Sequence, residues 1–89
     1  MKKLNKGPKE LKDTIDLMCS EDYKERFKAE YIQLKIRCDK LQDMLADYLA
    51  GKLKFEPICP YYVLRKQLDH MAEYLYILEV RAQLEGIEL

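Results

Sequence analysis

Several features that define common protein classes are missing from this sequence of 89 residues. It has no Trp, three Gly and three Pro, so long regular elements are favoured over loops. Three Cys without a CxxC spacing indicate neither a disulfide framework nor a zinc site. No apolar run approaches the roughly 18 residues of a membrane span, and the first residues lack an apolar signal-peptide core. We therefore expect a cytoplasmic protein without a membrane partner.

Neither enzymatic chemistry nor general nucleic-acid binding is favoured by the residue types present. The 16 basic residues balance 16 acidic ones, whereas binding along a DNA or RNA polymer needs an excess of positive charge. HExxH, GxSxG and glycine-rich phosphate-loop motifs are absent, and the lone histidine, His70, has no second histidine with which to hold a metal. We expect a binding protein, not an enzyme, and no cofactor.

Residues 1–19 have the character of a basic extension. Five lysines and a single glutamate lie within residues 1–12. Pro8 suits the first turn of a helix, and three apolar residues follow it at helical spacing: Leu11, Ile15 and Met18. This pattern predicts a helix over about residues 8–18, which is too short to be stable alone and must dock through those three residues.

A long helix is predicted over about residues 21–49. Ser20 is its expected N-cap, and Gly51 is a natural stop. Apolar residues recur along it in alternating steps of four and three, which is a heptad pattern: Phe27, Tyr31, Leu34, Cys38, Leu41, Leu45 and Tyr48.

A second long helix begins at about Pro60 and ends at Gly86, after which Ile87 can pack against the helix. It repeats the heptad pattern at Tyr61, Leu64, Leu68, Met71, Leu75, Leu78 and Ala82. The segment between the helices holds two prolines and forms a loop, whose apolar residues we expect to pin it across the helix ends: Leu53, Phe55 and Ile58. The predicted fold of residues 20–89 is therefore an all-α antiparallel helical hairpin, preceded by the short N-terminal helix.

The second long helix has more apolar surface than one partner helix can cover. A further face, which also includes His70 and Arg81, consists of Val63, Tyr74, Ile77, Val80 and Leu84. A helix that is apolar almost all round is buried on several sides. Because a small hairpin also has a thin core, we expect the protein to be an oligomer.

Candidate binding residues lie beside these apolar stripes, and each has two interpretations. Tyr31 is either a core residue or a ring on which a nucleotide base stacks. Lys28 and Lys35 either form salt bridges along the stripe or contact phosphate near an aromatic ring. Arg81, on the second apolar face, needs a matching charge, which is either a carboxylate across a subunit boundary or a bound anion.

Three segments of the sequence resemble a group of small phage and prophage proteins. They are RFKAEYIQLKIRCDKLQDML, FEPICP and QLDHMAEYLYILEVRAQLEGIEL, which together cover about residues 20–89. This group is related to a protein of crAss-like phage and to the phage anti-CBASS sponges, which are small helical hexamers. Members of the sponge family bind cyclic dinucleotides between protomers, and some bind cyclic trinucleotides at separate three-fold sites.

The resemblance implies a phage-encoded sponge that holds a cyclic di- or trinucleotide immune signal in the host cytoplasm. Tyr31 would then be the base-stacking tyrosine. Lys52 or Lys54, in the loop, would reach the phosphates, and Arg81 would mark the trinucleotide site. A different class of function remains open, because an oligomeric coiled-coil adaptor could present the second apolar face to a host or phage protein.

Overall fold

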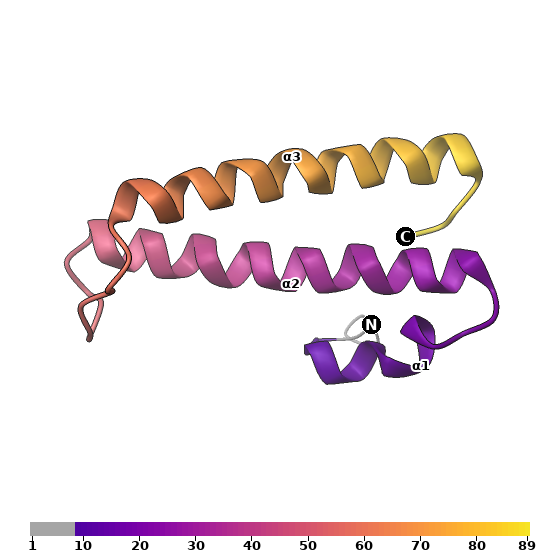
Figure 1. The fold of residues 1–89 in the computed structure, drawn as a ribbon, viewed down its shortest axis with the longest axis horizontal. Coiled ribbons are helices and arrows are strands. Elements are labelled where there is room, and N and C mark those ends of the chain that lie inside the picture. Colours follow the sequence, from indigo (N-terminus) through magenta and orange to yellow (C-terminus); the bar gives the residue numbers. More distant parts are fainter. Residues whose placement is uncertain (1–8) are drawn as a thin grey trace, which may run out of the picture.

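The computed structural model describes residues 9–89, and that part of the chain consists of helices and connecting segments without strands (Figure 1). Its elements are η2 (Leu11–Thr14), α1 (Ile15–Met18), α2 (Tyr23–Leu49) and α3 (Tyr61–Glu85). The predicted all-α class is confirmed. Lys2, Lys3 and Lys6 of the basic extension and the expected helix start at Pro8 lie outside the described residues, whereas Lys9 and Lys12 are described and exposed.

Helix α2 is capped by Asp22, so the prediction that Ser20 is the N-cap is wrong. The Asp22 side chain accepts a hydrogen bond from the backbone N–H of Lys24 at 2.9 Å, whereas the Ser20 hydroxyl oxygen accepts one from the backbone N–H of Asp22 at 3.0 Å. Both residue types are good caps, and the carboxylate adds a favourable interaction with the positive end of the helix dipole.

Both long helices end at a glycine in the left-handed conformation, as the sequence predicted. Gly51 has φ 73° and Gly86 has φ 71°. The next residue donates its backbone N–H back to the helix at 2.8 Å in each case, from Lys52 to Asp47 and from Ile87 to Ala82. Ile87 is buried, which confirms the apolar contact expected after the second glycine.

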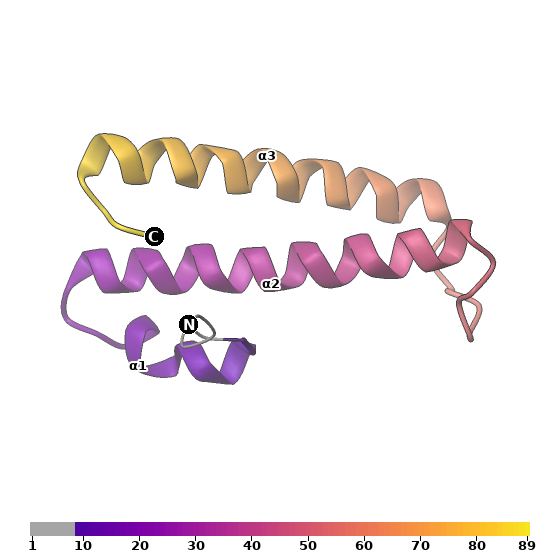
Figure 2. The same cartoon turned by 180° about the vertical axis from the view of Figure 1, so that it is seen from behind.

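Helices α2 and α3 lie side by side and run in opposite directions, as two opposite views show (Figures 1 and 2). Their shared core has two clusters of buried residues. The cluster near the start of α2 contains Phe27, Leu78, Ala82 and Ile87, with Tyr31 and Leu34 packed against it. The cluster nearer the loop contains Cys38, Leu45 and Leu68, with Leu41, Met44, Tyr61, Leu64 and Met71 packed against it.

The short N-terminal unit docks on α2 through Thr14, a residue outside the predicted face, and through part of that face. Thr14 is fully buried, whereas Ile15 and Met18 are about half exposed. The Thr14 hydroxyl accepts a hydrogen bond from the Gln33 side-chain amide at 2.7 Å and donates one to the Leu11 carbonyl at 2.7 Å. Leu11 is partly buried and Met18 Sδ accepts a hydrogen bond from Gln33 at 3.5 Å, so the predicted face was right in part. It was wrong at Ile15 because η2 is a 3₁₀ helix, whose tighter winding turns Thr14 rather than Ile15 toward α2.

The loop between α2 and α3 is not pinned by its apolar residues as expected. Ile58 is fully exposed at 103% and Phe55 is also exposed, while only Leu53 is partly buried. The loop extends past the ends of both helices (Figure 1). Prolines keep the residues before them out of helical conformation, so the chain does not fold back onto the helix ends here.

Candidate ligand-binding site

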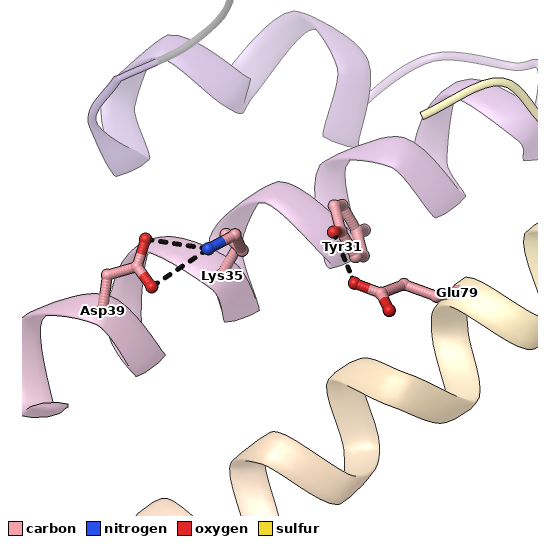
Figure 3. A network of polar contacts seen from close by, with 4 residues as sticks. All are labelled: Tyr31, Lys35, Asp39 and Glu79. Atoms are coloured by element: carbon pink, nitrogen blue, oxygen red, sulfur yellow. Dashed lines mark hydrogen bonds and ion pairs between the residues drawn. The ribbon is translucent and has the colours of Figure 1, made fainter.

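Tyr31 lies on α2 with its ring partly buried and its hydroxyl directed at α3 (Figure 3). The ring packs against the cluster around Phe27 and Leu78. Its hydroxyl donates a hydrogen bond to Glu79 Oε2 at 2.9 Å. Burial, together with this bond to a carboxylate, raises the pKa of Tyr31 to about 12. The ring is therefore fixed in direction by packing at its base and by a hydrogen bond at its tip.

Two lysines accompany Tyr31 along α2, at three residues before it and four after it. Such spacing places Lys28 and Lys35 on the same side of the helix as Tyr31. Lys35 Nζ lies 3.1 Å from both carboxylate oxygens of Asp39, in an exposed ion pair (Figure 3). Lys28 is partly buried. The structure thus brings together three of the predicted site residues, namely the tyrosine and both lysines.

Arg81 has a carboxylate partner within its own helix. Its Nε donates a hydrogen bond to Glu85 Oε2 at 2.8 Å, one helical turn away. Its guanidinium carbon also lies 4.8 Å from the centroid of the Phe27 ring on α2. The pKa of Arg81 is raised, first by the hydrogen bond to Glu85. The charge on this arginine is therefore matched inside the single chain.

Tyr31 and Arg81 occupy opposite flanks of the α2–α3 pair. The Tyr31 hydroxyl meets α3 at Glu79, which is two residues before Arg81. An α-helix turns by about 100° per residue, so side chains two residues apart leave it in nearly opposite directions. The predicted site residues therefore fall into two separate sets.

The loop lysines lie far from both sets within one chain. Lys52 and Lys54 are exposed and follow the end of α2. Tyr31 lies 18 residues before the last residue of α2, Leu49, which corresponds to about 27 Å along a helix. A lysine side chain does not span that distance, so the structure does not bring Lys52 or Lys54 to Tyr31.

The carboxylates that bind the tyrosine hydroxyls were not identified from the sequence. Besides Glu79, Glu30 on α2 accepts a hydrogen bond from Tyr74 on α3, and Glu85 on α3 accepts one from Tyr23 on α2 at 3.1 Å. The available signal was the presence of Tyr on one helix and Glu on the other, both beside the apolar stripes. That signal gives no register, so it does not say which tyrosine meets which glutamate.

Residues 9–89 contain neither a cluster of metal ligands nor a membrane-spanning helix. No group of three His, Cys, Asp or Glu side chains is close enough to hold a metal ion there. Within the same residues, no helix combines the length and the apolar character needed to cross a membrane. The three cysteines are free thiols.

The fold and these contacts define a helical protein whose aromatic and charged residues gather on two flanks of an antiparallel helix pair. The Sequestin family model matches residues 21–84, which is most of the chain. The chain belongs to the Sequestin family. No curated protein and no solved structure matches it.

Proposed function

We propose that this protein is a non-enzymatic sponge, which binds cyclic di- or trinucleotide immune signals and so withholds them from host defence effectors. The observation that carries the proposal is the family match over residues 21–84, because the family name denotes sequestration. The matched residues include all of α2 and nearly all of α3. Both Tyr31 and Arg81 lie within them. The resemblance to the anti-CBASS sponges supplies the class of ligand.

The surroundings of Tyr31 suit the binding of a nucleotide base beside a phosphate. A ring held by core packing and by Glu79 loses little freedom when a base stacks on it. Stacking on an aromatic side chain contributes about 1–3 kcal/mol per base and tolerates any base. Lys28 and Lys35 lie on the same side of α2 and supply positive charge for the phosphates. The exposed pair of Lys35 with Asp39 is easily exchanged, because such pairs contribute only about 0.2–1 kcal/mol.

The proposed pocket lies between copies of the chain. The loop lysines do not reach Tyr31 in one chain, so Lys52 or Lys54 would come from a second copy. Helix α3 has an apolar face to offer such a copy, since Ile77 is 52% exposed and Leu84 is 82% exposed. We propose a homo-hexamer, encoded by a phage and present in the host cytoplasm.

The presence of two separate sets of residues fits a protein with two kinds of pocket. Tyr31 with its lysines would hold a cyclic dinucleotide. Arg81, on the opposite flank, would hold the phosphates of a cyclic trinucleotide, where equivalent arginines from several copies converge. A guanidinium suits this role because it stays charged and presents paired donors to phosphate oxygens.

The test is to titrate the purified protein with cyclic dinucleotides and cyclic trinucleotides by calorimetry. The bound nucleotide is then released by heat and its mass measured. We expect saturable binding and an intact nucleotide after release. Recovery of a cleaved nucleotide would contradict a sponge.

The exposed apolar face of α3 favours one other function, that of an adaptor which binds a host or phage protein. An adaptor would bind none of the cyclic nucleotides in the titration. It would instead retain a specific protein partner through Ile77 and Leu84. The calorimetric titration therefore separates the two functions, because absence of nucleotide binding overturns the sponge.

A further inference from the structure

The end of α3 lies beside the first turns of α2, and several groups meet there on one carboxylate (Figure 1). Glu85 Oε2 accepts a hydrogen bond from Arg81 Nε at 2.8 Å. Glu85 Oε1 accepts one from the Tyr23 hydroxyl at 3.1 Å and a longer one from an Arg81 terminal nitrogen at 3.4 Å. The carboxylate is thus held by donors from both helices.

The donors around Glu85 are themselves held in place. The Arg81 guanidinium lies over the Phe27 ring, and Phe27 is a buried core residue. Lys24 Nζ lies 3.4 Å from the carbonyl oxygen of Gly86, which adds a second positive charge next to the carboxylate. The pKa of Glu85 is lowered, first by the hydrogen bond from Arg81 and also by Tyr23 and Lys24. Glu85 therefore carries its negative charge at neutral pH.

We propose that Tyr23, Lys24 and Arg81 form a phosphate-binding cradle, and that Glu85 is an internal anion that closes it. A guanidinium binds a carboxylate and a phosphate with the same paired donors, so the two anions compete for one place. This inference deepens the proposed function and rests on it for the source of the phosphate, which is the sequestered nucleotide.

The charges and the solvent exposure of these groups favour replacement of the Glu85 carboxylate by a phosphate. Lys24, Arg81 and Glu85 together have a net charge of +1, which rises to +2 when Glu85 leaves. The side chains of Arg81 and Glu85 are 47% and 30% exposed, so water is available to solvate the displaced carboxylate. Arg81 stays in position over Phe27 when Glu85 departs, because the aromatic contact does not depend on the carboxylate.

The same helix has a matched pair that lacks these additional groups. Arg65 and Asp69 are also four residues apart, with 3.2 Å between Arg65 Nη2 and Asp69 Oδ1, and both are exposed. Neither the hydrogen bonds nor the aromatic contacts of residues 9–89 add a tyrosine hydroxyl or a ring to this pair. Removing the acidic partner from each pair therefore isolates what the cradle contributes.

The experiment titrates pyrophosphate and a cyclic trinucleotide into the full chain by calorimetry, for wild type, Glu85→Gln and Asp69→Asn. We expect Glu85→Gln to bind both probes about two- to fivefold more tightly, which is the size of an exposed charge pair. Asp69→Asn should bind as wild type does. Adding Arg81→Gln to Glu85→Gln should abolish the gain. Circular dichroism confirms that each variant is folded.

Amide NMR shifts locate the bound probe. Gly86 is next to Glu85, and Asp69 belongs to the matched pair on the same helix. Pyrophosphate should shift the amide signal of Gly86 and leave that of Asp69 in place. Equal shifts at the two positions would indicate general binding of anions and overturn the cradle.

The outcomes separate the cradle from the proposed function. Tighter pyrophosphate binding by Glu85→Gln, without binding of any cyclic nucleotide, supports the cradle and contradicts the sponge. Cyclic nucleotide binding that is equal in wild type, Glu85→Gln and the double variant supports the sponge and overturns the cradle. Absence of all binding overturns both.

Discussion

Three tyrosine hydroxyls explain part of the high tyrosine content of this chain, because each bonds to a glutamate on the facing helix. Tyr23 and Tyr31 extend from α2 to Glu85 and Glu79, and Tyr74 extends from α3 to Glu30. A tyrosine suits a contact between two helices, because its ring covers apolar surface while its hydroxyl reaches the solvent-exposed edge of the helix pair. These hydrogen bonds fix the position of one helix relative to the other along the polar edges of the pair. Leucines at the same places would pack, but apolar packing is not directional.

The stacking role of Tyr31 is tested by two variants that separate its ring from its hydroxyl. Tyr31→Leu keeps most of the apolar volume but removes the aromatic face, so we expect cyclic dinucleotide binding to weaken by ~1–3 kcal/mol. Tyr31→Phe keeps the face and loses only the bond to Glu79, so most of the affinity should remain. Calorimetric titration measures both, and thermal melts establish that both are folded. Unchanged affinity in a folded Tyr31→Leu variant would remove the stacking role.

The raised pKa of Tyr31 predicts a loss of stability at high pH. The folded value is about 12 against an ordinary value of 10.0, with Glu79 and Asp39 as the nearby negative charges. Because the folded value is the higher one, this contribution is complete below pH 10 and is lost as the pH rises from 10 to about 12. Thermal melts between pH 9 and pH 12 should show the decline.

Tyr31→Phe is the control for this pH dependence. The pKa of the Cys38 thiol is also raised, chiefly by burial, and that effect acts in the same direction. The variant keeps Cys38 and loses the phenol, so its stability should fall less steeply than that of wild type above pH 10. Parallel curves for the two proteins would show that Tyr31 does not cause the decline.

At the scale of the elements, the long helices were predictable, whereas the short N-terminal unit was predicted as helical but not with the face that docks. The apolar spacing and the glycine stops predicted helices over about 21–49 and from Pro60 to Gly86, and the observed helices agree within two residues. A long helix tolerates a local error because many turns share one pattern. The N-terminal unit has two short elements, and a single 3₁₀ turn there changes the face that docks.

The candidate site was also predictable only in part. Helical spacing alone was enough to place Lys28 and Lys35 beside Tyr31. The contacts of Tyr31 with Glu79 and of Tyr23 with Glu85 were beyond its reach, since a contact between helices depends on the register of one helix against the other. That register is set by packing around residues such as Leu78 rather than by any local motif.

Replacing each of the two helix-ending glycines by alanine should lower the free energy of unfolding by a different amount. Gly51 and Gly86 have nearly the same backbone conformation, and a Cβ at either would meet no atom closer than 4.0 Å. Alanine at each position should therefore cost about 1 kcal/mol from the left-handed conformation alone. Gly86→Ala should cost more than Gly51→Ala, because the turn at Gly86 also holds Ile87 in the core.

Urea denaturation of both variants measures this difference. The comparison is matched, because the same substitution is made at the same kind of helix end. Equal free energies of unfolding for the two variants would mean that the burial of Ile87 does not depend on the glycine turn that ends α3.

At the scale of the whole molecule, no other element of residues 9–89 covers one side of α3. Val63, Ile77 and Leu84 are spaced at seven residues or multiples of seven, so they share a face, and all are exposed. His70 lies between them at the same spacing. The N-terminal unit, as far as the structure describes it, packs on α2 and not on this face. Apolar surface of this kind marks an interaction site, and a second copy of the chain is the partner that the proposed pocket requires.

Ile77→Glu tests this self-association directly. In an assembled protein it would place an unpaired carboxylate in an apolar contact, which costs several kcal/mol. We expect the variant to dissociate, with light scattering giving a mass near that of a single chain, 10.7 kDa, at micromolar concentration. The helices should stay folded, because Ile77 is already exposed in the single chain. Ile77→Leu is the control, since it keeps an apolar side chain of the same size at this position and should leave the assembly intact. A wild-type mass of one chain would overturn the oligomer, and with it a pocket that combines Tyr31 with a loop lysine from a second copy.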